Sequence, residues 1–131
     1  NILASEKIFL NNNIKKFIKL NVSAAFHSSL MNDAQEYLST EIDKLNLKEN
    51  NIKIISNFNA EISSNNSNII SALKKQMANK VMWTKSIRKL DEIGVGKVIE
   101  IGPGKILSSL IKRITNNIEI QSYSSVLDLK K

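Results

Sequence analysis

The spacing of hydrophobic residues along the chain predicts helices that alternate with strands. Apolar positions recur at three- and four-residue steps, the period of an amphipathic helix, over 1–13, 29–45, 65–77, 83–93 and 105–114. Alternating or β-branched runs predict strands at 15–23, 52–57, 97–101 and 118–123. This alternation is typical of a layered α/β fold with a largely parallel sheet.

The sequence also predicts where some of these helices begin or end and which of their residues face inward. Ser28, Ser29 or Asn32 could cap the helix over 29–45 with a side-chain oxygen, and Gly94 is the expected end of the helix over 83–93. The inward positions of the last two helices are predicted to be Trp83, Ile87, Leu90, Ile93, Ile106, Leu107, Leu110, Ile111 and Ile114.

Composition narrows the class of protein. The chain has 131 residues, of which 42% are hydrophobic and 24% charged, as in one globular domain or part of a larger one. It has no cysteine and one histidine, so we expect no metal site. No apolar run approaches the ~18 residues of a membrane span, and no secretory signal pattern opens the chain. We therefore expect a cytoplasmic protein. The first residue, Asn1, falls within an element, which suggests the C-terminal part of a longer chain.

The net charge of +7 raises the question of a nucleic-acid partner. Nucleic-acid modules usually combine aromatic residues with an arginine-rich stripe. Aromatic residues make up only 5% of this chain, and arginine occurs only at Arg88 and Arg113. We therefore expect no nucleic-acid binding, while an acidic protein partner or a phosphate-bearing substrate remains open.

The single histidine, His27, is the main candidate for catalysis. It lies in the segment VSAAFHSSLM at 22–31, and an imidazole can take a proton from a hydroxyl nucleophile near neutral pH. A purely structural histidine is the more common alternative. A Gly-x-Ser-x-Gly nucleophile motif, which would decide the matter, is absent from the chain.

Three other positions have simpler explanations on residue type alone. The segment IGPGK at 101–105 superficially suggests a phosphate loop, but it lacks the full Walker pattern and is better explained as a tight turn between a strand and a helix. Gln76 would ordinarily be a solvated helix residue, and Trp83 would ordinarily belong to the core.

Four segments together suggest a family. They are VSAAFHSSLM at 22–31, ISN at 55–57, QMANKVMWTKSIRKL at 76–90 and IEIGPGKILSSLIKRI at 99–114. In order and spacing, from about Phe17 to Ile114, they resemble the malonyl-CoA:acyl carrier protein transacylases of fatty-acid synthesis. The combination of AFHS, Q-x(6)-W-T-x-S and E-I-G-P-G-K-x-L is highly specific for that family.

The resemblance implies an α/β-hydrolase-like large subdomain that carries an inserted ferredoxin-like subdomain. On this basis residues 1–19 are the end of the small subdomain, and residues 20–131 are the C-terminal part of the large one. It also implies an [acyl-carrier-protein] S-malonyltransferase with malonyl-CoA as substrate, no bound cofactor, and acyl carrier protein as partner, without nucleic acid or membrane.

The resemblance also assigns roles to four residues. His27 takes the place of the family's catalytic histidine, which activates a serine that carries the malonyl group as an ester. The main-chain carbonyl of Gln76 is expected to orient His27. Phe26 and Ile106 are expected to contact the substrate, with the Ala25-Phe26-His27 triplet typical of malonyl rather than methylmalonyl selection.

Two expected parts of the active site are missing from this sequence. The family's Gly-His-Ser-x-Gly-Glu segment and its carboxylate-binding arginine would both lie upstream of Asn1. We therefore expect the chain by itself to be inactive, because it supplies the catalytic histidine but not the serine. The alternative hypothesis is a non-catalytic remnant that retains only a protein-interaction surface.

Overall fold

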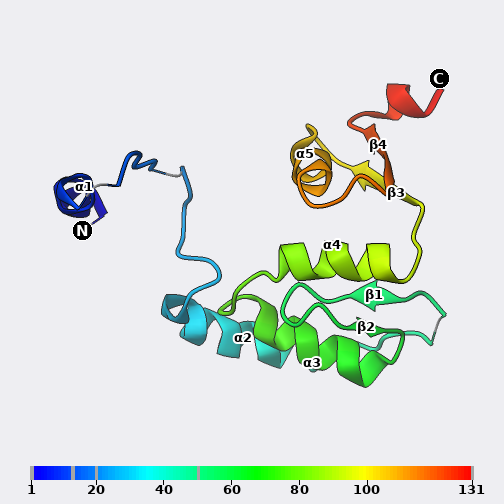
Figure 1. Cartoon of the computed structure of the whole chain (residues 1–131). Coiled ribbons are helices and arrows are strands. Elements are labelled where there is room, and N and C mark those ends of the chain that lie inside the picture. The colour runs from blue at the N-terminus through cyan, green and yellow to red at the C-terminus, as the bar shows by residue number, and fades with distance from the viewer. Residues whose placement is uncertain (1, 13, 20, 50, 131) are drawn as a thin grey trace.

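The computed structural model describes residues 2–12, 14–19, 21–49 and 51–130 (Figure 1). In this part of the chain, none of the helices is both long and apolar enough to cross a bilayer. The elements, in chain order, are α1 (Ile2–Asn11), η1 (Ser29–Met31), α2 (Asn32–Ile42), β1 (Ile54–Ile55), β2 (Ile62–Ser63), α3 (Asn66–Gln76), α4 (Trp83–Glu92), β3 (Lys97–Ile101), α5 (Ile106–Lys112), β4 (Glu119–Tyr123) and η2 (Val126–Lys130).

The described strands form two separate two-stranded sheets. β1 and β2 pair antiparallel, with Ile55 opposite Ile62. β3 and β4 pair parallel over five residues each, from Lys97 opposite Glu119 to Ile101 opposite Tyr123. The crossover between the parallel strands contains α5, so this unit is of the β-α-β type. The mixture of helix and strand agrees with the predicted α/β class, although only one of the two sheets is parallel.

Two predicted strands differ from the structure. The described residues of 15–23 form no strand, and Leu20 of that prediction lies outside the described residues. Phe17 instead stacks on Phe9 of α1, with ring centroids 5.9 Å apart. The strand predicted over 52–57 is reduced to β1, because Ser56 N–H donates to Glu61 O at 3.1 Å and the chain turns back into β2. This short hairpin was not predicted.

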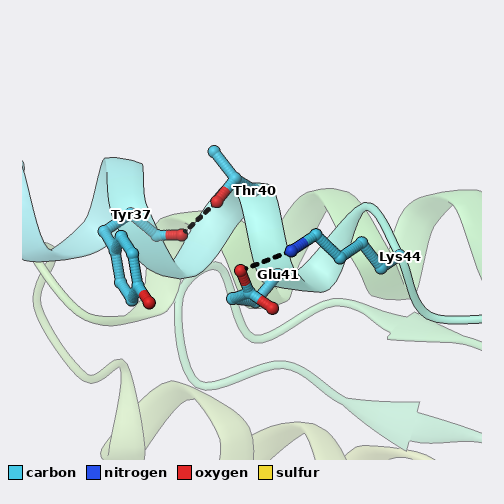
Figure 2. Close-up of polar contacts among 4 residues, drawn as sticks. All are labelled: Tyr37, Thr40, Glu41 and Lys44. Atoms are coloured by element: carbon cyan, nitrogen blue, oxygen red, sulfur yellow. Dashed lines mark hydrogen bonds and ion pairs between the residues drawn. The ribbon is translucent and has the colours of Figure 1, made fainter.

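α2 packs beside α3 (Figure 1). Lys74 of α3 forms an ion pair with Asp43, the residue that follows α2. The exposed pair of Glu41 on α2 and Lys44, two residues after α2, spans 2.6 Å, and Thr40 Oγ1 donates to Tyr37 O at 2.7 Å (Figure 2). Exposed pairs of this kind contribute little to stability, so packing against α3 is the main constraint on α2.

The buried apolar residues come from several elements, and they define a small core. They are Ile42, Ala60, Ile87, Ile111 and Ile118. Ile87 and Ile111 were predicted to point inward, and they do. Other predicted inward positions are exposed: Ile93 at 51%, Leu107 at 43% and Ile106 at 71%. Ile93 follows the last residue of α4, and Ile106 and Leu107 are the first two residues of α5.

A carboxylate joins α4 to the segment before β4. Asp91 accepts a hydrogen bond from Thr115 Oγ1 at 2.7 Å, and Asn117 Nδ2 donates to both of its oxygens at 3.0 and 3.1 Å. These donors, Thr115 first, hold the pKa of the Asp91 carboxyl below its ordinary value, against a smaller opposing effect of burial. The contact therefore fastens the β3-α5-β4 unit to α4.

The helix ends show which capping predictions were right. Ser28, Ser29 and Asn32 make no side-chain cap at the start of η1 or α2, and Ser28 Oγ instead donates to Ala25 O at 2.7 Å. Gly94 ends α4 as predicted, with φ at +76°. Gly94 N–H donates to Asp91 O and Val95 N–H donates to Leu90 O, both at 3.0 Å, which is the bond pair of a Schellman motif.

We predict that Gly94→Ala lowers the free energy of unfolding by about 1 kcal/mol, because a side chain disfavours the left-handed backbone. No atom lies within 4 Å of a Cβ built at Gly94, so the cost comes from φ alone. Gly96→Ala is the matched control, since Gly96 has the same open space without a left-handed φ. Urea denaturation measures both variants, and equal effects would contradict this explanation of the α4 end.

Candidate active site

His27 lies in a strained backbone conformation two residues before η1. Its φ is +64°, and among the described residues only Ala60 is another non-glycine residue with positive φ. Such conformations persist where surrounding contacts enforce them, and they are concentrated at functional sites. Here the His27 N–H donates to Met77 O at 2.8 Å, while the His27 side chain remains exposed.

The His27 ring faces two main-chain carbonyls. Nδ1 lies 3.2 Å from Gln76 O and 3.0 Å from Asn79 O. A carbonyl oxygen can only accept a hydrogen bond, so these contacts require the proton of the neutral ring to be on Nδ1. Nε2 then carries a lone pair and can accept a proton. The structure thus brings His27 and the Gln76 carbonyl together, and it adds Asn79, which sequence reasoning missed.

The end of α3 explains why carbonyls are available at this point. The last four carbonyls of an α-helix have no intrahelical partner and need donors from elsewhere. α3 ends at Gln76, and the next residues turn toward α4. The His27 backbone and ring supply donors to this segment. The donors of His27 therefore supply hydrogen bonds to carbonyls at the end of α3.

The ISN segment lies beside the same helix end. Ile55, Ser56 and Asn57 line a cavity of about 300 Å³ between the β1–β2 hairpin and α3, and Gln76 also lines it. Asn57 O accepts from Met82 N–H at 2.7 Å, which holds the start of α4 against the hairpin. Two of the four family segments therefore border one cavity.

The two predicted substrate contacts differ in their position relative to His27. Phe26 is adjacent in sequence, and its side chain is 53% exposed. Ile106 is the first residue of α5, on the opposite side of α4 from α3 (Figure 1). The structure thus leaves both side chains accessible, with Ile106 71% exposed.

Glu100 is a further residue that sequence reasoning missed. Its carboxylate accepts from Leu107 N–H at 3.0 Å, from Ser108 N–H at 2.9 Å and from the Ser108 hydroxyl. The Ser108 hydroxyl also lies 2.7 Å from Ser122 Oγ of β4. The Ser108 hydroxyl is the main reason why the pKa of Glu100 lies below its ordinary value, against partial burial. This network holds β3, α5 and β4 together.

The Gly-Pro-Gly segment connects β3 to α5 as a tight turn, as predicted. Gly104 has a φ of +87°, and Gly102 N–H donates to Tyr123 O at 3.1 Å. Within the described ranges, no group of three or more histidine, cysteine, aspartate or glutamate side chains is arranged to hold a metal ion.

Comparison with solved structures identifies the class of this fold. The structure matches an acyl-carrier-protein S-malonyltransferase from Burkholderia pseudomallei with a TM-score of 0.84 and 32% identity, over 98% of this chain and 42% of that chain. It also matches a malonyl-transacylase solved in complex with its type II PKS acyl-carrier protein, with a TM-score of 0.81 and 30% identity, over 88% and 38% of the two chains. The fold is therefore that of an α/β acyltransferase.

Sequence comparison finds relatives of this chain. The chain is 38% identical over 122 residues to the malonyl CoA-acyl carrier protein transacylase of Bacillus subtilis strain 168, which is 93% of this chain and 38% of that protein. No protein-family model matches. The predicted resemblance is confirmed: the chain is homologous to the malonyl CoA-acyl carrier protein transacylases and spans about two fifths of their length.

The Glu100 network predicts a pH-dependent stability. Because the folded pKa of Glu100 lies below its ordinary value, the ionised carboxylate stabilises the fold above about pH 4.3. That contribution is lost as the pH falls through the lower, folded pKa. We expect Glu100→Gln to be less stable than wild type at pH 7, with a difference that disappears in acid.

Chemical denaturation between pH 2 and pH 7 measures this difference. Glu36→Gln is the control, since Glu36 is exposed on α2, and its stability should follow that of wild type. A Glu100→Gln difference that persists unchanged in acid would mean that packing, rather than the carboxylate charge, carries the effect.

Proposed function

We propose that this chain takes part in the transfer of a malonyl group from malonyl-CoA to the phosphopantetheine thiol of acyl carrier protein, in fatty-acid synthesis. His27 is the general base of this reaction. The observation that carries the proposal is the His27 ring itself, with Nδ1 at hydrogen-bond distance from two carbonyls and Nε2 free to accept a proton. Homology to the malonyl CoA-acyl carrier protein transacylases supports the substrate class.

The reaction consists of two acyl transfers with the same proton route. In the first, Nε2 takes the proton of a serine hydroxyl, the serine oxygen attacks the thioester carbonyl, and the C–S bond breaks. The imidazolium returns the proton to the CoA thiolate. In the second, Nε2 takes the proton of the carrier-protein thiol, the sulfur attacks the carbonyl of the malonyl-serine ester, and the ester C–O bond breaks. The imidazolium then returns the proton to the serine oxygen. The carbonyls of Gln76 and Asn79 keep the second ring proton on Nδ1 throughout.

The serine and the arginine that would bind the malonyl carboxylate belong to polypeptide other than these 131 residues. The sequence contains no Gly-x-Ser-x-Gly motif, and the chain spans 38% of its Bacillus subtilis relative. The exposure of His27 leaves its ring accessible to such a serine. The chain alone therefore lacks a nucleophile, and this absence also favours the second candidate, a non-catalytic remnant that only binds a protein partner.

The same proposal includes the place of the chain in the larger fold. Residues 20–131 form the C-terminal part of an α/β-hydrolase-like large subdomain, and residues 1–19 form the end of a ferredoxin-like subdomain. The separation of α1 from the other helices supports this division (Figure 1). Acyl carrier protein is the proposed partner, supported by the similar transacylase solved with its carrier protein. The proposed location is cytoplasmic.

We predict that the chain incubated with labelled malonyl-CoA forms no stable acyl adduct. A fusion that places the serine-bearing region of the Bacillus subtilis relative before residue 1 should transfer malonyl groups. In that fusion, His27→Ala should lower the rate by on the order of 10²–10⁴, the usual loss for an acid–base group. Gln76→Ala should cost far less, because only its main-chain carbonyl faces the ring.

Intact-protein mass spectrometry and transfer to carrier protein measure these outcomes. A stoichiometric adduct on the isolated chain, or full activity of the His27→Ala fusion, would overturn the proposed role of His27. A folded fusion that binds carrier protein without transfer would identify the chain as the remnant.

Phe26 is the proposed gate for substrate size. Its side chain is 53% exposed beside His27, which supports the proposal that the ring excludes a branching methyl at the α-carbon of the acyl group. In the fusion, Phe26→Ser should relax the preference against methylmalonyl-CoA by about 10- to 200-fold, the worth of space for one methyl group. Phe26→Tyr keeps the ring and should keep the preference.

Specificity constants for both substrates measure this effect. A general loss of activity in Phe26→Ser, with an unchanged ratio of the two constants, would instead assign Phe26 to support of the loop.

A further inference from the structure

We propose that Gln35, assisted by the side chain of Asn79, is a positioning residue for His27. Gln35 lies in the first turn of α2 and is half-buried. Its Oε1 accepts a hydrogen bond from Ala78 N–H at 3.0 Å, across 43 residues of sequence. Ala78 belongs to the turn whose carbonyls hold the imidazole, so Gln35 acts on His27 through that turn. This inference rests on the proposed function of His27 as a base.

The hydrogen bond between Ala78 N–H and Gln35 constrains the orientation of one peptide plane. The peptide unit that joins Met77 to Ala78 contains the Met77 carbonyl and the Ala78 N–H, which point in opposite directions because the unit is planar and trans. The carbonyl accepts from His27 N–H at 2.8 Å, and the N–H donates to Gln35. The plane is therefore held from both sides, and its rotation would break both bonds.

A side chain of the turn itself, that of Asn79, constrains the rest of the turn. Asn79 Nδ2 donates to Lys75 O at 2.8 Å, one turn back on α3. This bond orients the residue whose main-chain carbonyl lies 3.0 Å from His27 Nδ1. Beyond the end of α3 no helical ladder constrains these carbonyls. The direction of these carbonyls therefore depends on Gln35 and Asn79. The tautomer of the His27 ring depends in turn on the direction of the carbonyls.

The helix that carries Gln35 also follows His27 closely in the chain. α2 begins five residues after His27, so the helix that follows the histidine is the one that reaches across to the turn. His27, the turn at 76–79 and Gln35 form one hydrogen-bonded loop. A purely structural Gln35 would stabilise the contact between α2 and α3 without any effect on where the imidazole proton resides.

The single histidine makes the test direct, because every imidazole signal of the chain belongs to His27. Long-range ¹H–¹⁵N NMR of the whole chain at neutral pH reports whether Nδ1 or Nε2 carries the proton. We expect the Nδ1–H form in wild type. Gln35→Met keeps the length of the side chain but removes the acceptor, whereas Gln35→Glu keeps an acceptor oxygen.

We expect Gln35→Met to lose the Nδ1–H signature and to exchange the Ala78 amide proton roughly tenfold faster. Gln35→Glu should retain both wild-type properties. A wild-type chain in the Nε2–H form, or a Gln35→Met chain with the wild-type tautomer, would overturn the proposal. So would a Gln35→Glu chain that behaves like Gln35→Met.

Thermal melting establishes whether each variant is folded at the temperature of the NMR measurement. Should Gln35→Met be unfolded there, Asn79→Ala tests the same turn, since it removes the side-chain bond of the half-buried Asn79 to Lys75 O. Loss of the Nδ1–H form in Asn79→Ala supports the proposal, and an unchanged tautomer overturns it. The tautomer does not depend on malonyl transfer, so an inactive fusion with an Nδ1–H ring would contradict the proposed function alone.

Discussion

The candidate site depends on the peptide unit between Met77 and Ala78. α3 ends at Gln76, and past that point the backbone groups must find partners outside the helix. His27 N–H binds the carbonyl of this unit and Gln35 binds its N–H. Because both bonds act on one rigid plane, the turn after α3 is held against α2, and the imidazole is held against the turn.

The acceptors of the His27 ring are neutral, and this matters for the proposed role of His27 as a base that takes and returns a proton. A carboxylate partner would add a full negative charge beside the ring, whereas the carbonyls of Gln76 and Asn79 direct the Nδ1 proton through their dipoles alone. The left-handed backbone of His27 is unfavourable by itself. In the structure this conformation is accompanied by the bond from His27 N–H to Met77 O.

The β3-α5-β4 unit is held together differently. The Glu100 carboxylate accepts hydrogen bonds from a small network of hydroxyl and backbone donors. Outside that network the unit leaves apolar side chains at the surface, and Ile101 is 84% exposed. The homologous transacylases are more than twice as long as this chain. Exposed apolar positions on a chain of this kind fit the proposal that the site is completed by polypeptide outside the 131 residues.

The sequence by itself determined the helices over 65–77 and 83–93, the end of α4 at Gly94 and the strands over 97–101 and 118–123, because each depends on local periodicity or on one backbone angle. Its motifs also indicated the resemblance to the malonyl CoA-acyl carrier protein transacylases, which sequence comparison confirms. Tertiary structure alone decided that 15–23 forms no strand among its described residues and that β1 turns back into β2, because a strand needs a partner. Only the tertiary structure showed that Gln35 accepts a hydrogen bond from Ala78 N–H and that Glu100 accepts one from Ser108 N–H. A side chain that bonds to a backbone N–H leaves no pattern in the sequence, since almost every residue type offers the same N–H.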